Sequence, residues 1–491
     1  MTTTLPPHLE SKPLPGTTLG EHLAIVRSLW DRYAPEALNW QKRNRGYHQA
    51  LEAIARFYIP PGERVLEIGS GTGDLLAALE PSEGVGIDCS TEMTRVAAAR
   101  HPHLTFHAMP VEELHLEGKT FDVIVLSDLV GQLYDLMAVF KKLRSVCHSG
   151  TKIVINWYSR LWQPIFATAE ALRLKSPMPV FNWTSPEDIE NLLRLAGFQV
   201  ISQTGHLLFP KRFPLLTTVM NRYLAHAPVF RLMCLTNWVV ARPERIDDGV
   251  QDPVVSVVVP CRNEAGNIEN LVRRLPSMGR HTEILFVEGH SKDNTLEECR
   301  RVAEKYPERD IRVLVQEGSG KGDAVRLGFS QARGDVLMIL DADLSVAPED
   351  LPQFYETLVS RKGDFINGSR MVYSMEAHAM RFLNLVGNRV FALLLSRLMG
   401  QPVKDTLCGT KVLFRRDYDR IAKGRAHFGK LDPFGDFDLL FGAAKLSLKI
   451  VELPVRYRER VYGETNISRF RHGWLLLRMC VRALRKLVLI P

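Results

Sequence analysis

The sequence lacks the features that mark several protein classes. None of its apolar runs approaches the roughly 18 uncharged residues of a transmembrane helix. Its first 20 residues are polar and rich in proline, so we expect no secretory signal peptide there. The seven cysteines form no CxxC pair, and their scattered positions exclude a disulfide framework and a cysteine-rich zinc site. We therefore expect a protein of the reducing cytoplasm.

Most of the net positive charge of the chain lies near the C-terminus. The chain has 491 residues and a formal net charge of +8. Residues 455–491 hold nine basic and two acidic residues, so this segment alone carries +7. Because the charge is confined to one end, it indicates a partner such as phosphate or an anionic membrane surface, not nucleic acid.

The rest of the sequence is typical of a globular α/β protein. Short β-branched apolar runs alternate with helical segments on both sides of a polar segment near residue 245. Continuous apolar strands separated by helices predict parallel sheets that helices cover on both faces. We therefore expect two α/β layered domains. The predicted boundaries are a tail and lead-in helix at 1–44, domains at 45–240 and 253–472, a linker at 241–252 and a terminal helix at 473–491.

A glycine-rich segment in the first half predicts a nucleoside site. VLEIGSGTGD (65–74) reads as a strand, a tight turn and the start of a helix. Glycines let the backbone approach a ligand where any Cβ would collide. The next strand ends at Asp88, whose carboxylate can accept both hydroxyls of a ribose. The glycines alone also suit a strand–helix turn that binds nothing, but Glu67 and the segment 121–133 favour the nucleoside site.

With FDVIVLSDLVGQL (121–133), this half resembles the class I S-adenosylmethionine-dependent methyltransferases over about residues 45–240. A Rossmann dehydrogenase is the alternative, but its GxGxxG spacing is absent. The resemblance implies a Rossmann-like fold with S-adenosylmethionine as the cofactor. The cofactor-binding residues that it implies are Glu67, Gly69, Gly71, Gly73, Asp88 and Ser127.

Two parts of the methyltransferase resemblance remain open. The family often places an acid after the third strand to hold adenine, and here Glu112 in FHAMPVEEL (106–114) could take that place. Methyl transfer needs orientation more than a catalytic group, because the sulfonium is already activated. Asn156, Trp157 and Tyr158 follow a predicted strand and could line the acceptor pocket or belong to the core.

In the second half, polar residues follow several apolar strands. Asp341 and Asp343 end the strand of VLMILDADLS (336–345). Two carboxylates at the end of a buried strand are costly unless they hold a cation, and Mg²⁺ or Mn²⁺ takes such carboxylates together with substrate phosphates. The companion motifs are VSVVVPCRNE (255–264), EILFVEGHSKDNT (283–295) and GSGKGDAVRLGF (318–329).

In this order the motifs resemble the GT-A inverting glycosyltransferases, and among them the dolichyl- or polyprenyl-phosphate sugar transferases, over about residues 253–475. The resemblance implies a GT-A fold, a nucleotide-diphosphate sugar as donor and a divalent metal. It implies that Pro260, Glu264, Glu288, Asp293 and Asp341 bind the nucleotide sugar, that Asp341 and Asp343 hold the metal, and that Lys321 and Arg370 line the diphosphate and donor cleft. Asp436 or Asp438 would be the base if the acceptor were a hydroxyl.

The acceptor end has an arginine cluster in place of the family's lysine. The family's R-x-x-G-E-S-K-like motif here ends in Asn466. Arginine binds phosphate bidentately, so a cluster of arginines could clamp the acceptor phosphate, although a solvated strand edge would look similar. The candidates are Arg456, Arg458, Arg460 and Arg469.

The terminal helix predicted at 473–491 is basic and amphipathic. Its basic residues fall on one helical stripe, and most others are apolar. Such a helix can lie in a membrane interface, or it can pack on its own domain. We expect the first, with the protein peripherally bound to the cytoplasmic face of the membrane.

Together these patterns predict a glycosyltransferase that moves a sugar to a polyprenyl phosphate, fused to a methyltransferase. One alternative is a saccharide or lipid hydroxyl as acceptor, with the N-terminal domain methylating the same product. Another is an N-terminal domain that only binds or scaffolds.

Overall fold

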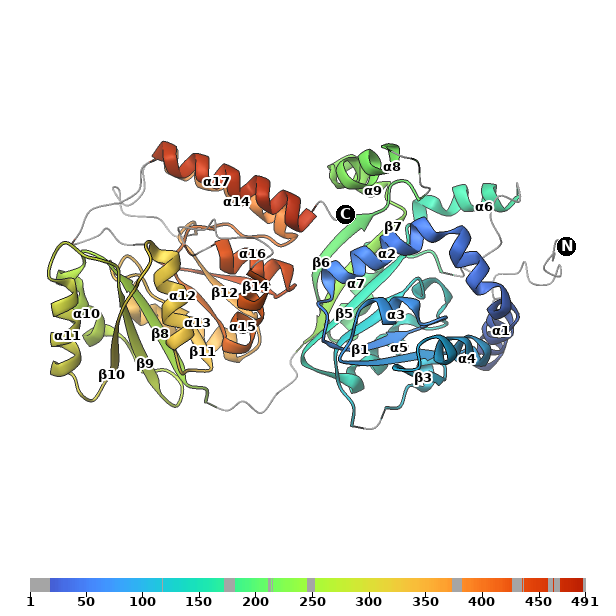
Figure 1. Cartoon of the computed structure of the whole chain (residues 1–491), viewed down its shortest axis with the longest axis horizontal. Coiled ribbons are helices and arrows are strands. Elements are labelled where there is room, and N and C mark those ends of the chain that lie inside the picture. The colour runs from blue at the N-terminus through green and yellow to red at the C-terminus, as the bar shows by residue number, and fades with distance from the viewer. Residues whose placement is uncertain are drawn as a thin grey trace. The chain divides into compact units, whose positions relative to one another are not determined.

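The computed structural model describes residues 18–116, 118–171, 182–210, 213, 215–244, 252–372, 382–425, 435, 437–457, 462 and 469–488. The chain divides into two compact units, one within residues 1–248 and one within 249–488 (Figure 1). Each unit contains one seven-stranded mixed sheet with helices on its faces, so the predicted pair of α/β layered domains is confirmed.

The N-terminal unit has the strand order β3-β2-β1-β4-β5-β7-β6. Strands β1 to β5 run parallel, and β7 is antiparallel to β5 and β6. The order reverses between β1 and β4, and open α/β sheets bind ligands at such a switch point. The strands are β1 (Arg64–Ile68), β2 (Glu83–Asp88), β3 (Thr105–Ala108), β4 (Phe121–Ser127), β5 (Cys147–Tyr158), β6 (Phe198–His206) and β7 (Thr236–Pro243).

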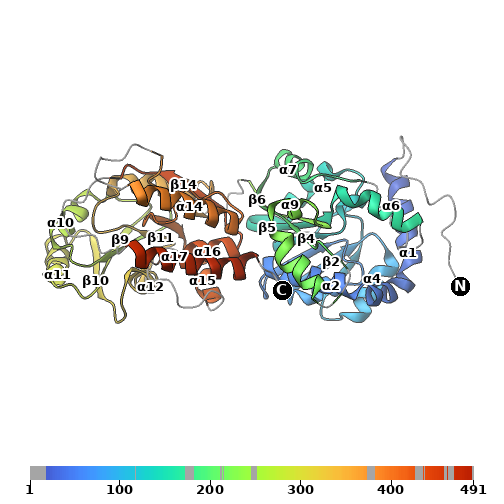
Figure 2. The same ribbon diagram turned by 90° about the horizontal axis from the view of Figure 1, so that it is seen from above.

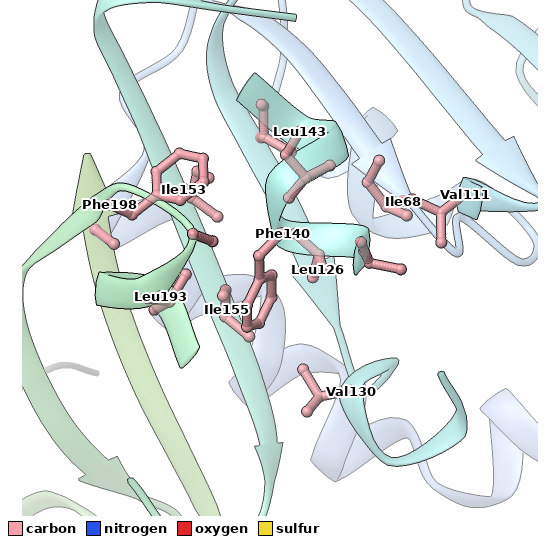
Figure 3. Close-up of a cluster of buried hydrophobic side chains, with 14 of the residues drawn as sticks. Ile68, Val111, Leu126, Val130, Phe140, Leu143, Ile153, Ile155, Leu193 and Phe198 are labelled. Carbon is pink, nitrogen blue, oxygen red and sulfur yellow. The ribbon is translucent and has the colours of Figure 1, made fainter. Parts of the chain in front are cut away.

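Helices cover both faces of this sheet. Along β4, Ile124 and Leu126 face a core shared with α5 and α7, and Val123 and Val125 face a second core that includes α2. Figure 3 shows Phe140 of α5 packed beside Leu126 in the first of these cores. The helices are α1 (Leu19–Arg43), α2 (Arg45–Tyr58), α3 (Asp74–Ala78), α4 (Thr91–Arg100), α5 (Leu136–Leu143), α6 (Gln163–Ala171), α7 (Pro186–Leu195), α8 (Leu216–Thr218) and α9 (Pro228–Leu232).

The C-terminal unit has the strand order β10-β9-β8-β11-β13-β12-β14. Its parallel strands β10, β9, β8 and β11 are followed by β13, which is antiparallel to β11 and β12. The switch point lies between β8 and β11. The strands are β8 (Val255–Cys261), β9 (Thr282–Glu288), β10 (Asp310–Val315), β11 (Val336–Ile339), β12 (Phe365–Ser369), β13 (Lys411–Phe414) and β14 (Ile450–Pro454).

Eight helices of this unit are described. Figures 1 and 2 show that α14 and α17 lie side by side. The helices are α10 (Ala265–Arg274), α11 (Thr295–Lys305), α12 (Lys321–Gln331), α13 (Leu351–Val359), α14 (Phe382–Met399), α15 (Arg415–Gly424), α16 (Phe437–Lys445) and α17 (Arg469–Ala483). None of the described helices combines the length and apolar character that crossing a bilayer requires.

Three details differ from the sequence-based expectation. The sheets are mixed, whereas parallel sheets were expected. A buried antiparallel strand such as β7 is as continuously apolar as a parallel one, so its sequence does not reveal its direction. The segment predicted as a linker at 241–252 begins inside β7, where Ala241 pairs with Val200. The terminal helix begins at Arg469 and not at residue 473, and a π-helical turn (Leu484–Val488) continues it.

Candidate active sites

A cavity of about 610 Å³ lies at the switch point of the N-terminal sheet. Its size is that of a small-molecule site. Of the predicted cofactor residues, Gly69, Gly71, Asp88 and Ser127 line it. Glu67 and Gly73 are not part of the described cavity wall, so their contact with a cofactor stays a prediction.

Asp88 holds the glycine-rich loop in place. Its Oδ2 accepts a hydrogen bond from the Gly71 N–H at 2.9 Å, and its Oδ1 accepts one from the Ser90 N–H at 2.8 Å. Burial raises the pKa of Asp88, and these two bonds oppose that rise. Gly73 has a φ of 75°, and a Cβ there would lie 2.6 Å from the Phe106 ring. The loop therefore needs both its glycine and the neighbouring carboxylate.

Glu67 lies in β1 beneath this loop. Its side chain is buried, and burial raises its pKa to about 8. The Oε2 atom has no hydrogen-bond partner among the described residues. Glu67 is therefore an acid held largely in its protonated form at neutral pH.

Glu112 lies just after β3. It lines the cavity, and its buried Oε1 has no hydrogen-bond partner in the described part of the chain. Burial raises its pKa. An unpaired buried acceptor is costly, and the amino group of an adenine would satisfy it. With Asp88 available for a ribose, the residues present fit the adenosine part of S-adenosylmethionine.

A polar cluster that the sequence analysis missed lies where β4 ends. Asp128 lines the cavity, and its carboxylate accepts hydrogen bonds from Tyr47 Oη at 2.7 Å and Asn156 Nδ2 at 2.8 Å. Tyr158 also lines the cavity, whereas Trp157 is buried in the core and donates to the Thr184 carbonyl. The acid immediately after the fourth strand was the signal that could have found this cluster.

The C-terminal unit gathers its predicted donor-site residues at one edge of the sheet. β9 ends at Glu288, β8 contains Pro260 and leads into Glu264, and β11 is followed by Asp341. These three strands are neighbours and parallel, so their carboxyl ends meet. The edge coincides with the switch point between β8 and β11, the usual place for a ligand in such a sheet.

Lys321 and Asp341 form an ion pair at this edge. Lys321 Nζ at the start of α12 lies 2.5 Å from Asp341 Oδ1. The backbone of Gly409 packs against the pair, and a Cβ at this position would overlap the Asp341 carboxylate. The segment around Gly409 therefore lies beside the candidate metal ligand.

Asp343 is the more enclosed of the two candidate metal ligands. It is buried, and its Oδ1 accepts the Ser345 N–H at 3.0 Å. Within the described residues, no group of three or more His, Cys, Asp or Glu side chains could hold a metal. Two carboxylates suit Mg²⁺ or Mn²⁺ only when a substrate diphosphate supplies further oxygens, so the residues fit a metal that binds together with the donor.

The loops after β8 and β9 hold each other through the candidate nucleotide-binding acids. The Glu264 N–H donates to Thr295 Oγ1 at 2.9 Å, and the Thr295 N–H donates to Asp293 Oδ1 at 3.1 Å. Glu288 Oε1 accepts the Ser291 N–H at 2.5 Å. The side chains of Asp293 and Glu288 and the backbone of Glu264 therefore fix the loop conformation. Contact of these residues with a nucleotide stays a prediction.

Two candidate catalytic residues lie in ion pairs. Arg370 is bound bidentately by the fully buried Asp405, with Nε–Oδ2 and Nη2–Oδ1 distances of 2.7 and 2.8 Å. Asp438 lies 2.6 Å from Arg425 Nε. Asp405 and Arg425 were not predicted from the sequence. The ion pair with Asp405 connects Arg370, just after β12, to the segment before β13. The ion pair with Arg425 occupies the carboxylate of Asp438, the candidate base.

Most of the arginines predicted to bind the acceptor phosphate lie outside the residues or side chains that the structure describes. Arg456 is exposed after β14. Arg458, Arg460 and Asp436 lie outside the described residues, and for Arg469 only the backbone in α17 is described. Their role as a phosphate clamp stays a prediction.

Each half of the chain matches a known protein family. Residues 40–203 match the family model of a methyltransferase domain, and residues 256–421 match the model of glycosyl transferase family 2. A crystal structure of an S-adenosylmethionine-dependent methyltransferase from Thermotoga maritima covers 44% of this chain and 99% of its own, at 17% identity and a TM-score of 0.36.

The curated relatives of the chain include two sugar transferases. The undecaprenyl-phosphate 4-deoxy-4-formamido-L-arabinose transferase of Edwardsiella ictaluri is 27% identical over 215 residues, which are 43% of this chain and 62% of the relative. The dolichol-phosphate mannosyltransferase of Pyrococcus furiosus is 30% identical over 222 residues, 44% of this chain and 59% of the relative. The chain thus spans about six tenths of each relative's length. Its first half thus matches a methyltransferase domain, and its second half matches glycosyl transferase family 2.

Proposed function

We propose that the C-terminal unit transfers a sugar from a nucleotide-diphosphate donor to a polyprenyl phosphate. The observation that carries the proposal is the meeting of Lys321, Asp341 and Gly409 at the switch point of the sheet. A cation and a closely approaching backbone suit a diphosphate, and the carboxylate suits a metal ion bound with it. The names of both curated relatives support a polyprenyl-phosphate acceptor.

The residues of this unit would act mainly by position and charge. An acceptor phosphate is already anionic, so its oxygen can attack the anomeric carbon, with inversion, without a strong general base. Lys321 would hold negative charge on the departing diphosphate. The Asp438–Arg425 pair agrees with a reaction that needs no base from α16. Arg370, held by Asp405, would keep the wall of the donor cleft in place.

Asp341 and Asp343 would hold a divalent metal when the donor is bound. Such a metal supplies electrostatic stabilisation of the diphosphate leaving group. Because Asp341 is paired with Lys321, we expect this carboxylate to be shared between the lysine and the donor complex.

The choice of acceptor distinguishes sugar transfer to a polyprenyl phosphate from the alternative, sugar transfer to a hydroxyl. Release of nucleoside diphosphate would be measured with undecaprenyl phosphate and with undecaprenol, which differ only in the phosphate. We expect release with the first and little with the second. Faster release with the alcohol would support the hydroxyl-acceptor alternative, for which Asp438 is the candidate base.

For the N-terminal unit we propose binding of S-adenosylmethionine and methyl transfer to an acceptor in the same cavity. Asp88 and the unpaired Glu112 Oε1 support an adenosine site, and the glycine-rich loop supports the methionine part. Calorimetry with S-adenosylmethionine tests the site. Absence of binding would leave a scaffold as the function of this unit.

The C-terminal helix supports peripheral attachment to a membrane surface. One face of α17 packs on its own unit through Met479, Cys480 and Ala483, as one of the two sequence-based alternatives expects. A second face exposes apolar side chains, with Trp474 64% and Val481 45% exposed. The neighbouring basic residues Arg478, Arg485 and Lys486 are also exposed, and Val390 and Leu393 of α14 add apolar surface. An apolar stripe beside a basic one suits an anionic membrane interface.

A further inference from the structure

We propose that Asp128 takes the proton of the methyl acceptor in the N-terminal unit, and that the acceptor group is therefore a hydroxyl or an amine. This inference rests on the proposed S-adenosylmethionine site. It assigns a chemical role to the cavity wall opposite the adenosine end.

The fold turns the Asp128 carboxylate toward the cavity. Asp128 follows β4 directly, and its backbone is left-handed with a φ of 53°. Its N–H donates to the Asn156 carbonyl at 3.1 Å, which fixes this turn against β5. A left-handed backbone is uncommon outside glycine, although aspartate tolerates it better than most residues, and such strain is often found at functional sites.

Neutral donors from two further elements hold the carboxylate. Tyr47 of α2 and Asn156 of β5 donate to it at 2.7 and 2.8 Å, and Tyr158 Oη lies 3.4 Å away. None of these groups carries a positive charge. Burial raises the pKa of Asp128 to about 6 while the three hydrogen bonds lower it. A carboxylate that titrates near neutral pH is well matched to accepting and releasing a proton.

The position of Asp128 matches the reacting end of the cofactor. The adenosine end is set by Asp88 at the end of β2 and Glu112 after β3. Asp128 follows β4, on the other side of β1 and its glycine-rich loop. A nucleoside held at the first end therefore points its 5′ substituent past the loop toward Asp128. Trp162 and Phe166 line the cavity beyond this point and leave the acceptor an apolar wall.

The reaction then balances within the site. A lone pair of the acceptor oxygen or nitrogen attacks the methyl carbon, and the carbon–sulfur bond breaks with its electron pair going to sulfur. The acceptor proton passes to Asp128 Oδ2. The sulfonium and the carboxylate become a neutral thioether and a neutral carboxylic acid, which returns its proton to solvent after product release. An acceptor carboxylate would be repelled by Asp128 and is excluded.

The inference can be tested without knowing the acceptor. Sinefungin replaces the methylated sulfonium of S-adenosylmethionine by a carbon that bears an ammonium group, and S-adenosylhomocysteine has no charge there. Calorimetry would compare both ligands with the wild type and with Asp128→Asn. Asp135→Asn is the matched control, because Asp135 is an exposed N-cap of α5 and asparagine caps helices equally well.

We expect Asp128→Asn to lose at least about tenfold in sinefungin affinity while S-adenosylhomocysteine binds within about twofold of the wild type. Asp135→Asn should bind both ligands as the wild type does. Unchanged sinefungin affinity in Asp128→Asn, or an equal loss of both ligands, would overturn the role of Asp128. A wild type that binds neither ligand would overturn the proposed cofactor site itself.

A second, independent inference comes from the connection between β6 and β7. Residues 207–235 contain four basic residues and no acidic residue. Their described part exposes large apolar side chains to an unusual degree for a monomeric surface. The most exposed are Leu215 at 81%, Val229 and Leu232 at 70% each, Tyr223 at 56%, Phe213 at 55% and Met233 at 53%.

This surface is continuous with the wall of the cavity. Trp162 Nε1 donates to the Met233 carbonyl at 2.9 Å, which joins the start of α6 to the end of α9. Ile165 of α6 is half exposed and also lines the cavity, as does Pro210. A methyl acceptor bound on this apolar surface can therefore enter the cavity without leaving the surface.

We infer that the described residues among 207–235 lie against an anionic lipid surface and that the methyl acceptor is an amphiphile carried there. Of the four basic residues, Arg222 and Arg231 are described and exposed, and together with the apolar side chains and the lack of acidic residues they match anionic headgroups above an acyl layer. The lipid substrate rests on the proposed methyl transfer, whereas the lipid contact does not.

Vesicle sedimentation tests the contact. The background variant carries Arg478→Glu, Arg485→Glu and Lys486→Glu, which reverse the exposed basic residues of α17 and of the π-helical turn that continues it. In that background we expect residual binding to phosphatidylglycerol-containing vesicles, and Leu215→Glu with Val229→Glu and Leu232→Glu should abolish it. S-adenosylhomocysteine binding by the same variant checks that the unit folds. Unchanged vesicle binding, or a dimer that the three glutamates dissociate, would overturn the inference.

Discussion

The carboxylate of Asp88 is bound to the backbone of the loop that it faces: its Oδ2 accepts the Gly71 N–H at 2.9 Å. The residue expected to bind ribose thus also holds the glycine-rich loop in its conformation. The other oxygen of Asp88, Oδ1, accepts the Ser90 N–H and so fixes the orientation of the carboxylate. The glycine-rich loop is therefore already ordered before a ligand binds.

Asp88→Ala should therefore lower S-adenosylmethionine affinity by more than one ribose contact. We expect a loss of at least about a hundredfold, because a partner to the ribose and a support of the loop are lost together. Calorimetry measures it, with Glu113→Gln as an exposed acid nearby for control. Transfer of sugar by the other unit should not change. Wild-type affinity in Asp88→Ala would contradict the assignment.

Glu67 makes the stability of the N-terminal unit depend on pH. Its carboxyl has a pKa of about 8 in the folded unit because of burial, and near 4.5 when unfolded. Between these values the folded state binds more protons, so stability falls as the pH rises from about 5 to 8. Glu67→Gln should remove this slope and stabilise the unit at pH 8 by a few kcal/mol, with little gain at pH 5.

Tryptophan fluorescence during urea unfolding measures this effect. Six of the seven tryptophans lie before residue 241, so the signal reports mainly on the N-terminal unit. Equal destabilisation of Glu67→Gln at both pH values would show that the acid is needed in its charged form.

Asp343→Asn should reduce glycosyl transfer by at least about a hundredfold with the fold unchanged, because one of two carboxylates for the metal is lost. Excess EDTA should have the same effect on the wild type, and added Mg²⁺ or Mn²⁺ should restore it. Asp419→Asn, an exposed acid of α15, is the matched control. Turnover of the wild type in EDTA would rule out the metal.

Gly409→Ala tests the approach of the backbone to the donor site. The added Cβ would overlap the carboxylate of Asp341 and crowd Lys321. A displacement of this pair by about an ångström should cost up to about a hundredfold in transfer rate. Gly424→Ala adds a Cβ in open space within the same unit and should be silent. An active Gly409→Ala would mean that the pair is not part of the donor site.

The basic stripe of α17 should control membrane binding in proportion to charge. Each basic group near an anionic surface contributes about 1 kcal/mol, so Arg478→Glu with Arg485→Glu should weaken binding to anionic vesicles by at least about tenfold. Arg300→Glu with Lys362→Glu reverses the same charge at exposed positions elsewhere in the unit. Equal loss in both variants would indicate a general effect of net charge.

The sequence predicted those features that lie within one strand and the loop that follows it. The apolar run before Asp341 and the glycines after β1 place their residues at the carboxyl edge of a sheet, and the structure agrees. The two layered domains follow from the same alternation of strands and helices.

The features that were missed depend on contacts between distant segments. Gly409 meets Asp341 only because β13 pairs antiparallel with β11, and an antiparallel strand cannot be told from a parallel one by its apolar pattern. The partners Asp405 and Arg425 that hold Arg370 and Asp438 are likewise set by tertiary packing. In the N-terminal unit, Tyr47 reaches Asp128 from a helix that precedes the whole sheet.

The central claim is that the C-terminal unit makes a glycosyl polyprenyl phosphate. The most direct test is mass spectrometry of the lipid fraction after the full chain is incubated with Mg²⁺, undecaprenyl phosphate in anionic vesicles and a panel of nucleotide-diphosphate sugars. We expect one donor to yield a lipid whose mass has increased by a single anhydrosugar, and Asp341→Asn to yield none. An unmodified lipid with every donor, or the same product from Asp341→Asn, would contradict the account.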